Sequence, residues 1–315
     1  MIFKNLQSTS IFILIFCFSA FSQKPDQTSN TLLWKISGNG LNKPSYLYGT
    51  MHVKDERAFH LSDTVYLGIK NCDVFAAEID MDEALNSLFT MIFSKDSINY
   101  LKNKMNDTDY ETLNQKLQEK TNLSLDIINS KNVWALDLLL NDYDHDEGDN
   151  QKQTFLDVYL YGMAKKMGKQ TTGLERLEDY SKIYSKFDEK AQIENLMHET
   201  NEKASQKGYD TLIKMYSSGN IDAINSYVNG GTQKGNPEMY VLNLRNINMA
   251  NRMDSIYKSK TLFTAVGAAH LSGDSGLINL LRLKGYTVSP LTAVYTLKES
   301  DFKYEDNEYS WHDLK

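Results

Sequence analysis

Cysteine is scarce in this sequence, and its scarcity excludes two kinds of structure. The chain has 2 cysteines in 315 residues, and one of them lies in an apolar stretch near the start. Removal of that stretch would leave Cys72 alone, which excludes an internal disulfide and a metal site built from thiolates. Any metal would then have to be held by histidine, aspartate, glutamate or asparagine.

An excess of basic residues is also missing, as are several common motifs. Lysine and arginine number 34 against 41 aspartates and glutamates, so the net charge is −7 and the sequence gives no sign of nucleic-acid binding. There is no G-x-S-x-G, no H-E-x-x-H, no phosphate-binding loop and no dinucleotide fingerprint. Hydrophobic residues make up 41% of the chain, which is enough for a sizeable core.

Long apolar runs are missing too, although the first 22 residues have the pattern of a secretory signal peptide. After a lysine near the start comes the apolar run Ile11–Phe18, and Ala20 and Ser22 offer small side chains for cleavage. The run is too short to cross a bilayer as a mature helix. An uncleaved anchor and a lipoprotein at Cys17 are alternatives, but large residues rather than small ones precede Cys17. We expect an exported protein, periplasmic or extracellular, with no membrane span after cleavage.

Two stretches far apart in the chain share one pattern, a run of strand formers followed by Gly-x-x-His. Tyr46–Gly49 leads to His52, and Leu262–Gly267 leads to His270. The glycine of each unit permits a sharp turn or a close approach. Each histidine is expected just past the carboxyl end of its strand, where α/β sheets bind ligands. A single such histidine is most often a surface or satisfied core residue, but two in the same setting favour one shared polar site.

Glu78 emerges near the end of a third apolar run, Asp73–Asp80, which is expected to be a buried strand. A carboxylate in such a strand is costly unless it is paired or used. A structural salt bridge is one explanation. The other is that Glu78 joins His52 and His270 in a three-ligand set with one position open for water, as a catalytic metal site requires.

Three further polar residues are candidates for supporting roles. Arg245 and Asn246 are adjacent in a long expected helix, residues 238–258, that leads into the second Gly-x-x-His unit. This pair can be a solvated helix face, or it can clamp an anion or stabilise the oxyanion of a tetrahedral intermediate. Glu175 ends the expected strand Thr171–Glu175 and is a candidate outer partner for an imidazole.

The order of the expected elements predicts an α/β domain over residues 23–300. Its central sheet is built from both ends of the chain and carries the paired strand–Gly-x-x-His units. A mainly helical insertion is expected at about residues 81–235, and residues 301–315 form a polar C-terminal tail. The two matching units suggest an internal pseudo-repeat.

Seven short motifs occur in the order seen in the TraB/GumN family, which the chain resembles from Leu32 to Pro290. They are Tyr48–His52, Ala77–Asp80, Leu156–Leu160, Gly173–Glu175, Leu244–Asn246, Val266–Leu271 and Leu280–Val288. The resemblance implies an α/β fold with both Gly-x-x-His units facing one cleft. It also implies that His52, Glu78, Arg245 and His270 match the family's site positions.

The resemblance supports the site positions better than it supports a particular reaction, and bacterial GumN-like members mostly have no known substrate. The family resembles the TIKI proteases, the pheromone-shutdown proteins and, more distantly, erythromycin esterases and ChaN-like haem-binding lipoproteins. TIKI-type members are described as metal-dependent proteases, and esterase-type members are hydrolases without a clear need for metal. If the chain is a hydrolase of these types, its expected substrate is a peptide or a small ester.

These observations lead to three hypotheses. In the first, the protein is an exported hydrolase, a metal-dependent peptidase in which His52, Glu78 and His270 hold manganese, cobalt or zinc and activate water, while Arg245 stabilises the oxyanion. The ligands do not choose among these ions. A metal-free variant of this hypothesis uses Glu78 and a histidine as general base.

In the second hypothesis, the same cleft captures haem, iron or a small ligand without turnover. In the third, the motifs only maintain the fold.

Overall fold

The computed structural model describes residues 30–83, 100–127, 133, 136, 140, 151–201, 206–230 and 237–296. The expected signal peptide and the expected C-terminal tail lie outside these residues, as does much of the helical stretch expected after Met81. Within the described part of the chain, no helix is both long and apolar enough to cross a membrane.

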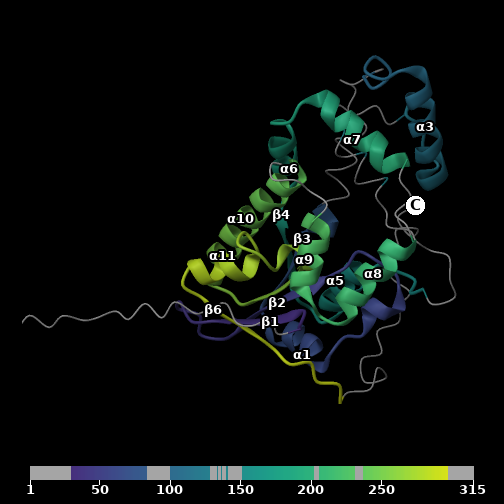
Figure 1. Ribbon diagram of the computed structural model, residues 1–315. Coiled ribbons are helices and arrows are strands. Elements are labelled where there is room, and N and C mark those ends of the chain that lie inside the picture. The colour runs from purple at the N-terminus through teal and green to yellow at the C-terminus, as the bar shows by residue number, and fades with distance from the viewer. Residues whose placement is uncertain are drawn as a thin grey trace, which may run out of the picture.

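A six-stranded sheet forms the centre of the molecule, in the order β4-β3-β5-β2-β1-β6 (Figure 1). The strands β2, β5, β3 and β4 run parallel, whereas β1 pairs antiparallel with both β2 and β6. The sheet is thus built from both ends of the chain, and the predicted α/β class is confirmed. The strands are β1 (Leu33–Ser37), β2 (Ser45–Thr50), β3 (Val74–Ile79), β4 (Gln170–Glu175), β5 (Leu262–Gly267) and β6 (Thr287–Pro290).

The turn between β1 and β2 is made by three residues with positive φ, Gly38, Asn39 and Gly40, at 78°, 45° and 85°. Glycine and asparagine adopt this left-handed region at little cost, so the hairpin follows from local sequence. The strand β5 follows from its apolar content: its first five residues are buried, as expected for a parallel strand covered on both faces.

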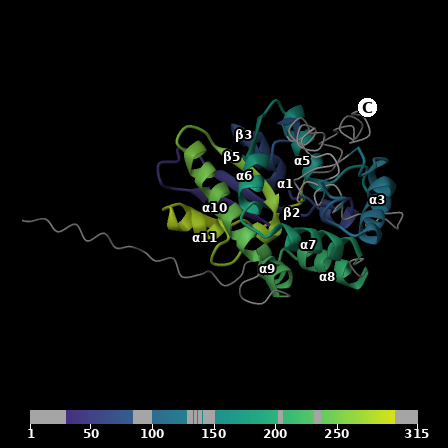
Figure 2. The ribbon, with the colours of Figure 1, turned by 90° about the horizontal axis from the view of Figure 1, so that it is seen from above.

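Helices cover both faces of the sheet. On one face, β-strand residues such as Tyr48 and Phe263 pack in one core with residues of α1 (Asp63–Asn71), α5 (Leu156–Lys166) and α8 (Gln206–Ser217). Figure 2 shows α10 and α11 on the other side of the strands from α1 and α5. There the strands' alternate residues pack against α10 (Pro237–Tyr257) and α11 (Leu277–Leu283).

The middle of the chain divides between this sheet and a second apolar core. Within the expected insertion, α5 and β4 belong to the sheet and its cover. The second core packs α3 (Asp107–Thr121) against α7 (Glu189–Asn201), away from the strands in Figure 1. The remaining described helices are η1 (Glu56–Phe59), α6 (Leu177–Tyr184), α9 (Ile221–Gly230) and η3 (Ala268–His270).

The register of the parallel strands decides where the polar side chains meet. In the pairing of β2 with β5, Gly49 lies opposite Val266 and Thr50 opposite Gly267. The strand β5 pairs on its other side with β3. Three neighbouring strands, β2, β5 and β3, therefore end at the same edge of the sheet, and each carries one of the predicted metal ligands at or just past its end.

Candidate functional site

His52, His270 and Glu78 converge at the carboxyl edge of the sheet. His52 lies two residues beyond the end of β2, and His270 is the last residue of η3, the short turn that follows β5. Glu78 is the second-last residue of β3. Because β5 lies between β2 and β3, the His270 turn lies between the other two groups along the edge.

One oxygen of Glu78 is the common point of the cluster. Its Oε1 lies 3.5 Å from Nε2 of His270 and 4.0 Å from Nε2 of His52. The backbone N–H of Gly267 donates to the same oxygen at 2.6 Å. The His52 side chain is 53% exposed, whereas those of Glu78 and His270 are 13% and 6% exposed. The cluster is therefore buried on one side and open to solvent at His52.

The glycines of the two units allow close approach rather than a left-handed turn, since neither has positive φ. A Cβ at Gly267 would lie 3.2 Å from Glu78 Oε1 and 3.6 Å from Cδ2 of His270. A Cβ at Gly49 would lie 3.1 Å from both Ala268 Cβ and Leu271 Cδ2. Gly267 thus leaves space for the site's side chains, and Gly49 lets β2 pack against the turn that carries the second histidine.

The other ring nitrogen of each histidine is held by a partner from a helix. Nδ1 of His52 donates to Oδ2 of Asp157 in α5 at 2.7 Å, and the hydroxyl of Thr50 donates to the other oxygen of that carboxylate. Nδ1 of His270 donates to Oδ1 of Asn246 in α10 at 2.6 Å. Such outer partners fix the ring orientation and tautomer, and they are typical of metal-binding histidines.

Asp157 is the functional candidate that the sequence analysis missed. It occurred there only as part of a family motif, without a role of its own. The available signal was its position, a carboxylate in the first turn of an otherwise largely buried helix. Sequence alone does not reveal that this turn of α5 lies beside His52, because the two residues are 105 positions apart.

Arg245 and Glu175 form a charged layer behind Glu78. Nη2 of Arg245 donates to Glu78 Oε2 at 2.8 Å and to Glu175 Oε2 at 2.8 Å, and its Nε donates to Glu175 Oε1 at 3.0 Å. The guanidinium also lies over the ring of Tyr180, 4.9 Å from its centre, and the Tyr180 hydroxyl donates to Glu175. The layer fixes the carboxylate of Glu78 from the side away from the histidines.

Glu175 was expected to be a partner of an imidazole, but its hydrogen bonds go to Arg245 and Tyr180 instead. The strand order explains the difference. Glu175 ends β4, which lies beyond β3, so it is separated from the strands that carry the histidines by the strand of Glu78. The hydrogen bond to an imidazole that was expected of Glu175 is made by Asn246, which accepts from His270.

The charges of the cluster shift the pKa values in different directions. Asp157 raises the pKa of His52 to about 9. Burial lowers the pKa of His270 to about 4, although Glu78 opposes this. Burial would raise the pKa of Glu78, but His270, Arg245, His52 and the Gly267 N–H outweigh it and lower this pKa to about 2. At neutral pH, Glu78 is therefore ionised and His270 is neutral. The imidazole of His52 is protonated on both nitrogens unless a bound cation displaces the proton on Nε2.

The position of the proton on His270 can be assigned from its partners. The amide N–H of Asn246 donates to the carbonyl of Ser275 at 2.8 Å, so its oxygen faces His270 Nδ1, which must carry the ring proton. Nε2 of the neutral ring then presents a lone pair to the ionised Glu78 oxygen 3.5 Å away. Two facing acceptors repel each other unless a positive species lies between them, so the pair is suited to binding a cation.

The donor set fits a divalent cation in chemistry, because it combines two imidazole nitrogens with one carboxylate oxygen. Two ligand atoms on one tetrahedral zinc ion lie roughly 3.4 Å apart, which is close to the His270–Glu78 spacing and shorter than the His52–Glu78 spacing. Among the residues that the structure describes, no group of three or more histidine, cysteine, aspartate or glutamate side chains is arranged as a formed metal site. His52, the exposed member, would have to move inward to complete one.

Comparison with known proteins places these residues in a family. The TraB/PrgY/gumN family model matches residues 32–290. The chain is similar to metalloprotease TIKI2 of Xenopus tropicalis, at 24% identity over 336 residues that cover 87% of this chain and 62% of that protein. It is also similar to metalloprotease TIKI1 of Danio rerio, at 24% identity over 84% of this chain and 64% of that protein.

These relatives are distant and longer, since the chain spans less than two thirds of their length. No solved structure gives a significant match. The family match, by contrast, covers most of the chain and includes both Gly-x-x-His units, Glu78 and Arg245. The protein therefore belongs to the TraB/PrgY/gumN family.

Proposed function

We propose that this protein is an exported, metal-dependent peptidase whose site is the His52–Glu78–His270 cluster. The observation that carries the proposal is that Nε2 of His270 and Nε2 of His52 lie 3.5 and 4.0 Å from one oxygen of Glu78, an arrangement of two imidazoles and a carboxylate that suits a divalent cation. The names of the distant relatives, metalloproteases, support the choice of reaction. The pattern of residues 1–22 supports export to the periplasm or outside the cell.

The roles of the three ligands follow from their surroundings. His52, Glu78 and His270 would hold a divalent ion such as manganese, cobalt or zinc. Bound there, the ion would supply Lewis acidity and lower the pKa of a water molecule. Asp157 and Asn246 orient the imidazoles, and Arg245 keeps Glu78 ionised.

Arg245 is also proposed to stabilise the oxyanion that forms on the substrate. Its Nε and Nη2 are occupied by Glu175 and Glu78. Nη1 has no hydrogen-bond partner among the described residues, so it is the nitrogen that a substrate oxygen would have to reach. The two carboxylates hold the guanidinium in place before the substrate arrives, which reduces the cost of ordering it during the reaction.

The test combines metal analysis with peptide hydrolysis by the full chain produced without a histidine tag. We expect about one divalent ion per chain, hydrolysis that a chelator abolishes and a divalent metal restores, and loss of both ion and activity in His52→Ala, His270→Ala and Glu78→Gln. His60→Ala is the matched control, because His60 stacks on Tyr295 outside the cluster. It should retain both ion and activity.

The result also separates the alternatives. Hydrolysis that survives complete removal of metal would support Glu78 and a histidine acting as general base, and would contradict the metal requirement. Visible absorbance on addition of haem, with no hydrolysis of a peptide or ester library, would favour a binding protein instead.

A further inference from the structure

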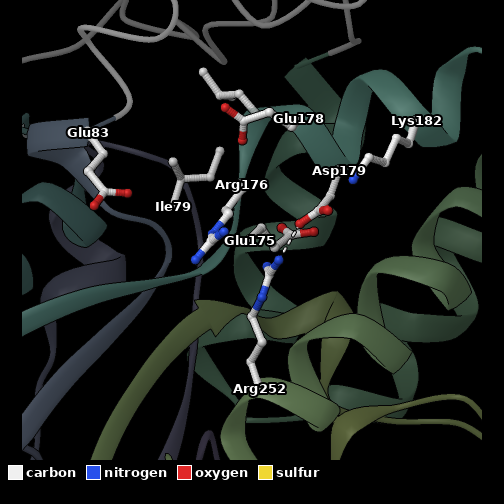
Figure 3. A pocket seen from close by; sticks show the side chains of 9 residues that line it. Ile79, Glu83, Glu175, Arg176, Glu178, Asp179, Lys182 and Arg252 are labelled. Atoms are coloured by element: carbon white, nitrogen blue, oxygen red, sulfur yellow. Dashed lines mark hydrogen bonds and ion pairs between the residues drawn. The ribbon is translucent and has the colours of Figure 1, made fainter.

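A pocket of about 410 Å³ lies next to the cluster, at the carboxyl ends of β3 and β4 (Figure 3). Its walls include Ile79, which follows Glu78 in β3, and Glu175, which binds Arg245 behind the site. The pocket and the cluster therefore share the Glu78–Arg245–Glu175 layer. A volume of this size exceeds that of a single amino-acid side chain and falls within the range of ligand pockets.

Most of the charges deep in the pocket are already neutralised by partners. Arg252 pairs with Asp179, as the dashed line in Figure 3 shows. Glu175 accepts hydrogen bonds from Arg245 and Tyr180. Arg252 and Asp179 thus neutralise each other, whereas Arg245 is shared between Glu175 and Glu78.

Arg176 differs from Arg252, the other arginine among the described residues that line this pocket. It follows Glu175 directly at the end of β4, and its side chain is exposed. Its guanidinium has no hydrogen-bond, ion-pair or ring partner among the described residues. Figure 3 shows its guanidinium below Ile79, and both residues line the pocket. A positive charge that has no ion-pair partner in the described part of the chain thus lines the pocket beside Ile79.

The remaining charged groups that line the pocket are exposed, as Arg176 is. They are Glu83, Glu178 and Lys182, and Figure 3 shows the Glu178 carboxylate above Ile79, on the other side from the Arg176 guanidinium. An anionic group entering the pocket is therefore attracted at Arg176 and repelled near Glu178. This asymmetry favours one direction of binding, with the anion at Arg176 rather than at Glu178.

We propose that this pocket is a substrate subsite of the peptidase and that Arg176 binds a carboxylate of the substrate. The carboxylate belongs either to an aspartate or glutamate side chain near the scissile bond or to the C-terminus of a peptide. A guanidinium matches both, because it donates two parallel hydrogen bonds to a carboxylate. This inference rests on the proposed function for its position in catalysis, but the recognition of a carboxylate can be measured without turnover.

The kinetic test uses two sets of peptides, acetylated at the N-terminus and amidated at the C-terminus, that differ only by Glu or Gln at successive positions. We expect the metal-loaded full chain to cleave the best Glu peptide with kcat/KM about tenfold higher than its Gln counterpart. The preference should disappear in Arg176→Gln. It should persist in Lys186→Gln, a matched loss of one positive charge on the same segment outside the pocket.

The source of the carboxylate is decided by a third set of peptides with a free C-terminus and no acidic side chain. A preference for the free acid over the amide, lost in Arg176→Gln, would identify the terminal carboxylate. The inference would be overturned if the wild-type protein cleaved Glu peptides as fast as Gln peptides and free-acid peptides as fast as amidated ones. That result would leave the proposed function intact. A preference that survives in Arg176→Gln would also overturn the inference.

The binding test covers the case in which no peptide is cleaved. The same peptides are titrated into the metal-free, isotope-labelled protein, and the NMR signals of Arg176 and its neighbours are followed. Shifts caused by the acidic peptides, absent in Arg176→Gln and present in Lys186→Gln, would support the subsite even though the peptidase proposal had failed. Equal binding of acidic and neutral peptides would overturn it.

Discussion

Asp157 controls the charge of the exposed imidazole of the cluster. It accepts the Nδ1–H of His52 at 2.7 Å, and the hydroxyl of Thr50 fixes its second oxygen. This arrangement holds the His52 proton on Nδ1, raises the pKa of the ring and points Nε2 toward Glu78. One carboxylate outside the Gly-x-x-His units therefore sets both the orientation and the protonation of a proposed ligand.

Replacement of Asp157 by asparagine tests this role. In Asp157→Asn the pKa of His52 should fall from about 9 toward its ordinary value, because the charge that favours the imidazolium is removed. Affinity for a divalent ion should also fall, by roughly 10–100-fold, because the ring loses its outer partner. NMR titration of the imidazole and calorimetric metal titration measure the two effects.

Asp210→Asn is the control for that substitution, since Asp210 pairs with Arg57 and has no contact with the cluster. It should change neither the His52 titration nor the metal affinity. An unchanged pKa of His52 in Asp157→Asn would contradict the assigned hydrogen bond.

At the scale of elements, the two glycines have separate functions although their sequence contexts match. Gly49 lies where β2 packs against η3, and a methyl group there meets Ala268 and Leu271 at 3.1 Å. Gly267 lies beside polar side chains, and a methyl group there meets Glu78 Oε1 at 3.2 Å. The first position is a packing contact between elements, and the second is a contact with the site.

Alanine at these two positions should therefore give different results. Gly49→Ala should lower the free energy of unfolding by about 1–3 kcal/mol, because the extra methyl group overpacks the contact between β2 and η3. Gly267→Ala should chiefly weaken metal binding, because it displaces the Glu78 carboxylate. Denaturant unfolding and metal titration of both variants provide the measurement, each variant serving as the control for the other. Equal effects of both substitutions on both quantities would contradict the assignment.

The structure of the elements was largely predictable because it depends on local pattern. The hairpin turn, the apolar run of β5 and the long helix containing Arg245 occur where glycine, strand formers and helical periodicity indicated them. The partner of Glu175 was predicted wrongly, and Asp157 was given no role. Both depend on which elements are neighbours, and local sequence does not encode this.

At the scale of the whole molecule, the folded state and the bound ion are linked through protons. Without metal, the raised pKa of His52 stabilises the folded protein below the ordinary pKa of histidine, about 6.5, and this contribution is lost as the pH rises through about 9. Metal binding depends on pH in the opposite direction: it strengthens as the pH rises, because the ion must displace the proton on Nε2 of His52. The lowered pKa of His270 has the opposite effect on folding, since it destabilises the folded protein at acid pH and this cost is lost as the pH rises through about 6.5. Above about pH 4 the folded His270 is already neutral, so it has no proton to lose when the ion binds.

The stabilisation by metal should therefore increase with pH. An ion at 100 times its Kd stabilises the protein that binds it by about 2.7 kcal/mol. Because Kd falls as His52 loses its proton, the increase in Tm on adding manganese at a fixed concentration should grow between about pH 6 and pH 9. Thermal unfolding with manganese and with a chelator measures this increase. The increase in Tm on adding manganese should be absent in His270→Ala and retained in His60→Ala. A manganese effect that falls with rising pH would contradict the linkage.

The sequence by itself determined the α/β class, the strands that carry His52, Glu78 and His270, and the family, because these depend on residue types at fixed spacings along the chain. Only the tertiary structure decided that β5 lies between β2 and β3, that Asp157 reaches His52 and that Arg245 joins Glu78 to Glu175. The physical reason is that the order of strands in a sheet is set by how helices pack against both of its faces. That packing is a property of the whole folded chain rather than of any one segment.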